Sequence, residues 1–172
     1  MCWVNGIRWQ GSSADFLIYE VYNNDNMNLK ILIFAFFISH PLFTFAAELV
    51  DLSVEQVRSM QRTNDGLVID IRTEKEWQDT GIIASSHPLM FFDNEGKYNT
   101  EKWLAHLTKL KSYPDQPVIL VCRSGNRSSR VGRYLTQQLG MNNVYHLSGG
   151  IKAWLKSGQK LDKICSNQIA CK

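Results

Sequence analysis

One short segment concentrates the side chains that could do covalent chemistry. Cys122 directly follows an apolar run of strand length, Val118–Val121, and opens the sequence CRSGNRSS. A cysteine is a nucleophile only as the thiolate, and a helix N-terminus with nearby arginines favours that form. Gly125 lets the backbone curl so that several N–H groups point at one anion. We therefore expect a cradle for an anionic sulfur, or for an oxyanion bound beside it.

Four further residues of this loop have distinct expected roles. Arg123 and Arg127 supply fixed positive charge, which either attracts an anionic donor or is solvated surface charge. Ser128 and Ser129 are placed to cap the helix that follows. The alternative for any lone cysteine at a strand end is a buried, unreactive side chain. Arginines and a glycine directly after Cys122 favour the reactive thiol instead.

The sequence patterns of strands and helices alternate along the chain, and these elements must position the Cys122 loop. The expected strands are 67–71, 118–121 and 144–147. Two helices are expected to begin at the capping boxes Ser53–Gln56 and Thr73–Glu76. Three further helices are expected from the apolar stripes 103–110 and 131–139 and from Ile151 with Trp154. Such alternation predicts an α/β fold with a central, mainly parallel sheet flanked by helices on both faces. Sites in these folds lie at the carboxyl ends of strands, where Cys122 stands.

Two charged residues interrupt the first of these apolar strands. Asp70 lies inside it and Arg72 follows it, and an acid among apolar residues needs hydrogen-bonding partners. We expect both to order the loops around the site, with Glu76 close to Arg72 at helical spacing, rather than to react. The four histidines show no ligand spacing, so we expect no metal site.

Length and composition describe an ordinary globular domain. The chain has 172 residues, of which 44% are hydrophobic and 20% charged, so a disordered protein is excluded. The net charge of +3 is too small and too scattered to indicate a nucleic-acid-binding protein. Four cysteines are too few for a small disulfide-built fold.

The segment 27–46 has the three parts of a secretory signal. Lys30 precedes the apolar core ILIFAFFI at 31–38, and Thr44 and Ala46 fit the positions three and one before a cut, so we expect cleavage after Ala46. The alternative is an anchor that stays attached, although the apolar stretch falls short of the ~20 residues that a span needs. The expected location is the periplasm or the cell exterior, with no membrane contact after cleavage.

Residues 1–26 fit a signal poorly because acidic residues outnumber basic ones there. We interpret them as an upstream extension without a folded role, with translation starting at Met27; a disordered leader is the alternative. The expected organisation is thus an extension at 1–26, a signal at 27–46, one domain at 47–158 and a tail at 159–172.

Three blocks in this domain resemble the rhodanese-like sulfurtransferases, specifically their small, single-domain, exported members. VIDIR at 68–72 followed by Glu76-Trp77 looks like the family's first block, Cys122 to Ser128 looks like its active-site loop, and LSGGI at 147–151 with Ala153-Trp154 and Gly158 looks like its closing block. The blocks occur in the family's order, and the resemblance covers residues 50–158.

The resemblance implies a rhodanese-like fold and a two-step sulfur transfer. The Cys122 thiolate would take the outer sulfur of a small anionic donor such as thiosulfate and pass it, as a persulfide, to a thiol or to cyanide. The backbone amides of the loop would hold the persulfide anion, which makes Arg123, Ser124, Gly125, Asn126, Arg127 and Ser128 the expected substrate-binding residues. No cofactor other than the covalent persulfide is implied, and we expect a monomer.

Two other functions compete with this one. A phosphatase or arsenate reductase of the related fold needs five residues between cysteine and arginine, whereas here Arg127 comes one place early and Ser128 takes its position. A periplasmic persulfide carrier or sulfide-sensing module would need the same Cys122 and the same loop. Multiple turnover with thiosulfate and cyanide distinguishes an enzyme from such a carrier.

The tail adds a redox expectation. Removal of the signal leaves Cys122, Cys165 and Cys171, and an odd number in an oxidising compartment leaves one thiol free. Because the catalytic thiol must be that one, we expect a Cys165–Cys171 disulfide. The alternatives are two free tail thiols and a dithiol that accepts sulfur from Cys122.

Overall fold

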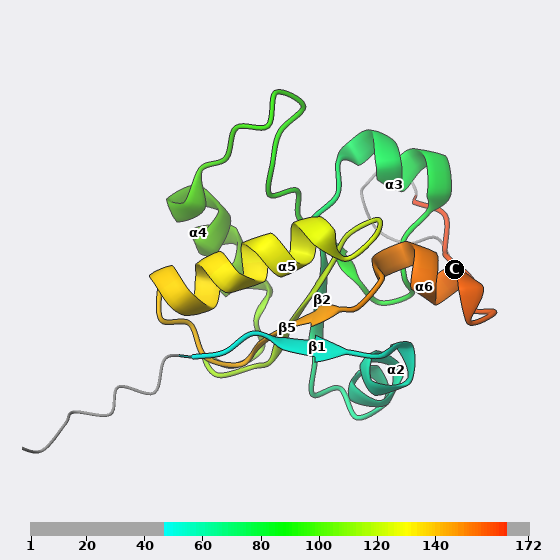
Figure 1. The fold of residues 1–172 in the computed structure, drawn as a ribbon, viewed down its shortest axis with the longest axis horizontal. Coiled ribbons are helices and arrows are strands. Elements are labelled where there is room, and N and C mark those ends of the chain that lie inside the picture. Colours follow the sequence, from blue (N-terminus) through cyan, green and yellow to red (C-terminus); the bar gives the residue numbers. More distant parts are fainter. Residues whose placement is uncertain (1–46, 165–172) are drawn as a thin grey trace, which may run out of the picture. The chain divides into compact units, whose positions relative to one another are not determined.

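The computed structural model describes residues 47–164, which form a parallel five-stranded sheet with helices on both faces (Figure 1). The strands are β1 (Val50–Leu52), β2 (Leu67–Asp70), β3 (His87–Pro88), β4 (Val118–Val121) and β5 (Val144–Leu147), in the spatial order β1-β5-β4-β2-β3. The α/β fold with a parallel sheet is therefore confirmed. The predicted extension, the signal and the Cys165–Cys171 pair lie outside the described residues and stay predictions.

The helices follow the expected pattern closely. They are α2 (Val54–Arg62), α3 (Glu74–Thr80), α4 (Thr100–Leu110), α5 (Asn126–Arg133), the π-helical continuation η1 (Tyr134–Gln138) and α6 (Gly150–Lys156). Both predicted capping boxes are present, Ser53 with Gln56 on α2 and Thr73 with Glu76 on α3. Within residues 47–164, no helix is long and apolar enough to cross a membrane.

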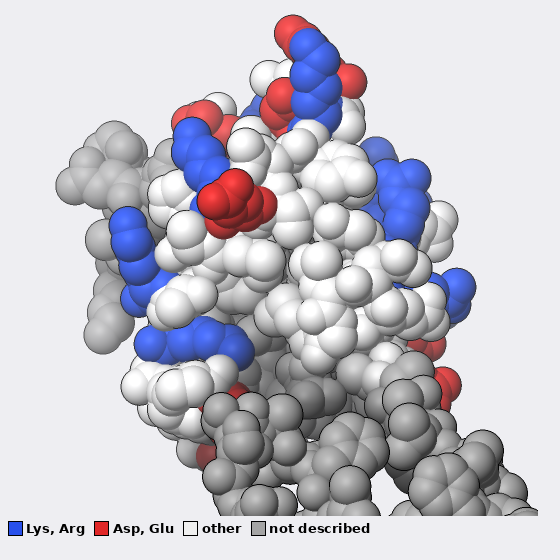
Figure 2. Space-filling view, turned by 90° about the vertical axis from the view of Figure 1, so that its left-hand side faces the viewer, with Lys and Arg blue, Asp and Glu red and all other residues white. Residues whose placement is uncertain are grey.

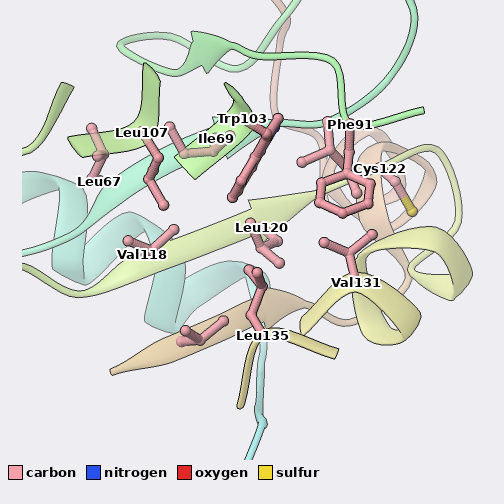
Figure 3. Packing of buried hydrophobic residues seen from close by; sticks show 12 residues of the cluster. Leu67, Ile69, Phe91, Trp103, Leu107, Val118, Leu120, Cys122, Val131 and Leu135 are labelled. Atoms are coloured by element: carbon pink, nitrogen blue, oxygen red, sulfur yellow. The ribbon is translucent and has the colours of Figure 1, made fainter. Parts of the chain in front are cut away.

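Two apolar clusters cover the two faces of the sheet. In β4, Val118 and Leu120 contribute to the cluster that also contains residues of α4 and α5, while Ile119 and Val121 contribute to the one with residues of α2 and α6. All four β4 side chains are buried, because a central parallel strand is covered on both sides. Figure 3 shows the first cluster running along the sheet to the sulfur of Cys122.

The two edge strands were not predicted. β1 has three residues and β3 has two, and both strands are partly exposed. Because they are so short, neither contains an apolar run that would indicate a strand. β1 pairs with β5, and its register places Asp51 opposite His146. This pairing brings a surface carboxylate next to a buried imidazole.

One face of the molecule shows how the charged side chains are distributed (Figure 2). On the face shown in Figure 2, Lys and Arg side chains stand in separate groups around a broad area of uncharged residues. This distribution agrees with the small net charge of +3.

The turn before α6 packs directly on the loop that follows β4. The backbone N–H of Ile151 donates to the carbonyl of Cys122 at 2.9 Å, and the N–H of Lys152 donates to the carbonyl of Arg123 at 3.1 Å. Gly150 has a φ of +58°, and a Cβ on it would lie 2.2 Å from the Cys122 carbonyl oxygen. Only a glycine lets the two turns approach this closely.

Substitution of this glycine tests how far the fold depends on the contact. Gly150→Ala should lower the free energy of unfolding by clearly more than the ~1–2 kcal/mol that a left-handed alanine costs, because the Cys122 turn must also move. Gly140→Ala is the matched control, since Gly140 has a φ of +64° and a Cβ added to it would meet no atom within 4 Å. Urea unfolding measures both variants, and equal losses would contradict the steric argument.

Candidate active site

The sulfur of Cys122 lies at the carboxyl end of β4 and is surrounded by donors. The N–H of Gly125 points to Sγ at 3.2 Å, the N–H of Ser128 at 3.4 Å and the hydroxyl of Ser128 at 3.4 Å. Cys122 is only 1% exposed. Two backbone amides and one hydroxyl aimed at one sulfur stabilise a negative charge on it.

The loop turns into α5 through a glycine. Gly125 is the N-cap of α5 with a φ of +89°, and its carbonyl accepts the first helical hydrogen bond from the N–H of Ser129 at 2.9 Å. The expectation that Ser128 or Ser129 caps the helix is therefore wrong. Ser128 lies within the first turn, fully buried, and its hydroxyl is directed at the Gly125 carbonyl and at Sγ.

The other predicted loop residues surround this turn at the surface. Arg123, Ser124 and Asn126 have exposed side chains, and Arg127 is half-buried. The structure thus brings all six predicted substrate-binding residues onto the one turn. It divides them into Gly125 and Ser128, which contact the sulfur, and the remainder, which form the rim.

Arg127 forms an ion pair with Glu76 of α3. Its Nη1 donates to Glu76 Oε2 at 2.8 Å, and its Nη2 donates to the other carboxylate oxygen. Burial alone raises the pKa of Glu76, but hydrogen bonds from Arg127 and from the N–H of Thr73 outweigh it and lower that pKa to about 2. The hydrogen bond to Glu76 raises the pKa of Arg127, and the nearby charge of Cys122 contributes. Arg127 thereby links α3 to the cysteine loop.

Asp70 and Arg72 form a buried pair beside the site. Both side chains are 1% exposed, and Arg72 Nη2 donates to Asp70 Oδ2 at 2.7 Å. The same guanidinium donates to the carbonyl of Gly81 and to the hydroxyl of Thr80, each at 2.7 Å. Arg72 also reaches the backbone carbonyl of Glu76 at 3.5 Å, whereas the Glu76 carboxylate turns to the loop. This geometry supports a positioning role, because the pair fixes the end of β2 against α3.

Sequence reasoning missed two residues behind the sulfur, His146 and Asp51. The Nδ1 of His146 lies 3.3 Å from the hydroxyl oxygen of Ser128, and its Nε2 lies 2.6 Å from Asp51 Oδ1. Alternation in β5 could have indicated that His146 faces inward with Val144. Nothing in the sequence indicated its contact with Asp51, because that contact depends on the register of an unpredicted strand. Within residues 47–164, no group of three His, Cys, Asp or Glu side chains has the arrangement of a metal site.

Comparisons with known sequences find relatives named as sulfurtransferases and rhodanese-domain proteins. The chain is 31% identical over 103 residues to the thiosulfate sulfurtransferase GlpE of Pseudoalteromonas translucida, which covers 60% of this chain and 86% of the relative. It is 32% identical over 103 residues to the GlpE of Pseudomonas aeruginosa, covering 60% of this chain and 81% of that protein. It is 30% identical over 102 residues to the rhodanese domain-containing protein CG4456 of Drosophila melanogaster, covering 58% and 91%.

Solved structures show the same fold. A thiosulfate sulfurtransferase from Pseudomonas aeruginosa superposes with a TM-score of 0.55 at 22% identity, covering 67% of this chain and 20% of that one. A polysulfide-sulfur transferase from Wolinella succinogenes gives a TM-score of 0.50 at 23% identity, covering 65% and 77%. The family model described as the rhodanese-like domain matches residues 53–157. This match contains β2, the cysteine turn after β4 and the Gly149-Gly150 turn that packs on it, and the chain belongs to the rhodanese-like domain family.

Proposed function

We propose that this protein is a sulfurtransferase that carries sulfane sulfur on Cys122. The observation that supports this most directly is the environment of Sγ. The sulfur accepts hydrogen bonds from the backbone amides of Gly125 and Ser128 and from the Ser128 hydroxyl. These donors favour a thiolate, and a thiolate is the nucleophile that sulfur transfer requires. The relatives named thiosulfate sulfurtransferase point to the same chemistry.

The first step would load the cysteine. The Cys122 thiolate attacks the outer sulfur of thiosulfate, a new S–S bond forms, and the S–S bond of the donor breaks. Sulfite leaves with the electron pair of that bond, and Cys122 becomes a persulfide anion. The amides of Gly125 and Ser128 are directed at Sγ before the attack, so they stabilise the negative charge of the attacking thiolate.

The second step would return the enzyme to its resting state. Cyanide or an acceptor thiolate attacks the outer sulfur of the persulfide, and thiocyanate or the acceptor's persulfide leaves. The electron pair of the Cys122 S–S bond stays on Sγ as the thiolate. Both steps balance without an external oxidant, reductant or cofactor, which is why none is proposed.

Arg123 is the residue best placed to attract the anionic donor. Its side chain is exposed, and within residues 47–164 no carboxylate forms an ion pair with it. The charge of Arg127, by contrast, is balanced by Glu76. We therefore assign long-range attraction to Arg123 and loop positioning to Arg127.

We also propose that the protein is exported, and this part of the proposal rests on the signal-like segment 27–46. The proposed substrates are a small anionic sulfur donor and a thiol or cyanide acceptor, handled by a single chain in the periplasm or outside the cell. The competing carrier function would load Cys122 with sulfur once without repeated turnover. Repeated formation of thiocyanate from thiosulfate and cyanide distinguishes the enzyme from the carrier.

Loss of the thiol should abolish transfer. Incubation with thiosulfate should add ~32 Da, one sulfur atom, to the peptide that contains Cys122, and cyanide should remove it. Cys122→Ser should lose both the mass shift and thiocyanate production, whereas the unaltered chain should turn over many times. Normal turnover by Cys122→Ser contradicts the mechanism, and loading without turnover identifies a carrier.

Neutralising Arg123 should weaken donor capture without affecting chemistry. Arg123→Gln should raise the KM for thiosulfate by about threefold to tenfold with kcat unchanged, and added salt should shrink the difference. Arg133→Gln is the matched control, since Arg133 is exposed on α5 and changes the net charge equally. Equal effects of the two variants on KM would show that only net charge matters.

Removing the Glu76 carboxylate should destabilise the loop in a pH-dependent way. Glu76→Gln should cost about 1–2 kcal/mol of unfolding free energy at pH 7, because a half-buried bidentate pair is lost. The pKa of Glu76 is lowered from 4.5 to about 2 on folding, so this contribution is complete above pH 4.5 and is lost as the pH falls towards 2.

Urea unfolding of both proteins at a series of pH values measures this difference. The stability gap between the unaltered chain and Glu76→Gln should close progressively below pH 4.5. Glu74→Gln, an exposed residue on the same helix, is the control and should show a small gap throughout. A gap for Glu76→Gln that stays constant to low pH contradicts the assigned pairing.

A further inference from the structure

Three side chains, those of Ser128, His146 and Asp51, form a hydrogen-bonded chain from the Cys122 sulfur to the protein surface. The Ser128 hydroxyl lies 3.4 Å from Sγ and 3.3 Å from His146 Nδ1, and His146 Nε2 lies 2.6 Å from Asp51 Oδ1. Ser128 is fully buried and the His146 side chain is 5% exposed, whereas Asp51 is 68% exposed. A buried polar chain with a solvent-exposed end connects the sulfur to one surface carboxylate.

Three elements hold this chain in place. In the sheet, His146 of β5 is registered between Leu120 of β4 and Asp51 of β1. Ser128 descends onto it from the first turn of α5. Each member is therefore fixed by backbone hydrogen bonding, and the contact between them does not depend on a flexible loop.

The proton positions follow from the chemistry of the groups. An ionised carboxylate only accepts hydrogen bonds, so the 2.6 Å contact places a proton on His146 Nε2. In the neutral ring, Nδ1 carries no proton and accepts a hydrogen bond. Three acceptors then compete for the single proton of the Ser128 hydroxyl: Nδ1, Sγ and the Gly125 carbonyl oxygen, which lies 3.0 Å from the hydroxyl oxygen. In the imidazolium, Nδ1–H donates to the Ser128 oxygen instead. The hydroxyl proton is then left to the Gly125 carbonyl and Sγ.

We propose that Asp51 and His146 are positioning residues: with protons on both ring nitrogens, His146 donates to the Ser128 oxygen, directs the hydroxyl proton towards Sγ and so stabilises negative charge on the cysteine sulfur. This inference rests on the proposed nucleophilic role of Cys122. The charge is present on Sγ in the attacking thiolate and develops there again when the persulfide S–S bond breaks. The chain therefore acts at both steps, through Ser128 in each case.

The helix α5 and the strands β4 and β1 pack against β5, which carries His146. From α5, Arg127 is paired with Glu76, Arg130 lies over the ring of Phe92, and Arg133 is exposed. From β4, the residue registered with His146 is the apolar Leu120. From β1, Asp51 is the acid that contacts the ring. The imidazole thus contacts Asp51 on one side and, through the Ser128 hydroxyl, reaches the cysteine sulfur on the other.

Alkylation of Cys122 tests the proposal without requiring turnover. The full-length chain is treated with iodoacetamide from pH 5 to 9.5, the modified Cys122 peptide is quantified by mass spectrometry, and each rate is divided by its own value at pH 9.5. This ratio reports the thiolate fraction and removes differences in access. It remains measurable if Cys122 proves not to transfer sulfur, so failure of the proposed function is distinguished from failure of this inference.

His146→Gln should slow Cys122 alkylation at pH 6.5 by about threefold to tenfold relative to its high-pH value, and Asp51→Asn should act in the same direction but less. The midpoint of the profile should move to higher pH in both. His106→Gln is the control, because this exposed histidine of α4 should leave the profile unchanged. Asp51 is exposed, so Asp51→Asn tests the chain even if a variant at buried His146 fails to fold.

A double variant distinguishes an effect that passes through the Ser128 hydroxyl from a merely structural effect. In a Ser128→Ala background, His146→Gln should add no further shift, because its effect passes through the hydroxyl. The proposal is overturned if Asp51→Asn and His146→Gln give the profile of the unaltered chain. It is equally overturned if His146→Gln shifts the profile as much without the Ser128 hydroxyl as with it.

Discussion

The sulfur site depends on the hydrogen bonds that tie two backbone carbonyls to the start of α6. The carbonyls of Cys122 and Arg123 accept from the N–H groups of Ile151 and Lys152. Fixing these two carbonyls fixes the direction in which the turn leaves β4, and the turn then carries the amides of Gly125 and Ser128 towards Sγ. The cradle is therefore made by two turns packed backbone to backbone, and it is not a property of the cysteine loop alone.

The arginines around the site have different uses although they look alike in the sequence. Arg72 is buried with Asp70 and supports the end of β2, and Arg127 is held by Glu76 and joins α3 to the loop. Both satisfy structural demands, because a guanidinium that is withdrawn from water needs a carboxylate and further acceptors. Arg123 is left exposed, and for this reason the proposed function assigns it the attraction of an anionic donor.

The parts that sequence reasoning predicted well are those with a local cause. Long apolar runs indicated β2, β4 and β5, and the placement of Cys122 after β4 followed from them. The parts it missed depend on distant pairings: Glu76 meets a guanidinium 51 positions away, and Asp51 meets a ring 95 positions away. The capping role expected of Ser128 failed because Gly125, in a left-handed conformation, already begins the helix and turns that serine inward.

The burial of Cys122 bears on how easily its sulfur is oxidised. At 1% exposure, the bare thiol is screened from peroxide and other oxidants that attack surface cysteines. A second sulfur extends the side chain by an S–S bond of about 2.05 Å. In the proposed cycle, the transferable sulfur is thus the outermost atom of the side chain, while Sγ stays buried. If the proposed cycle operates, burial protects the Sγ atom that is reused in every cycle, whereas the outer sulfur is replaced each time.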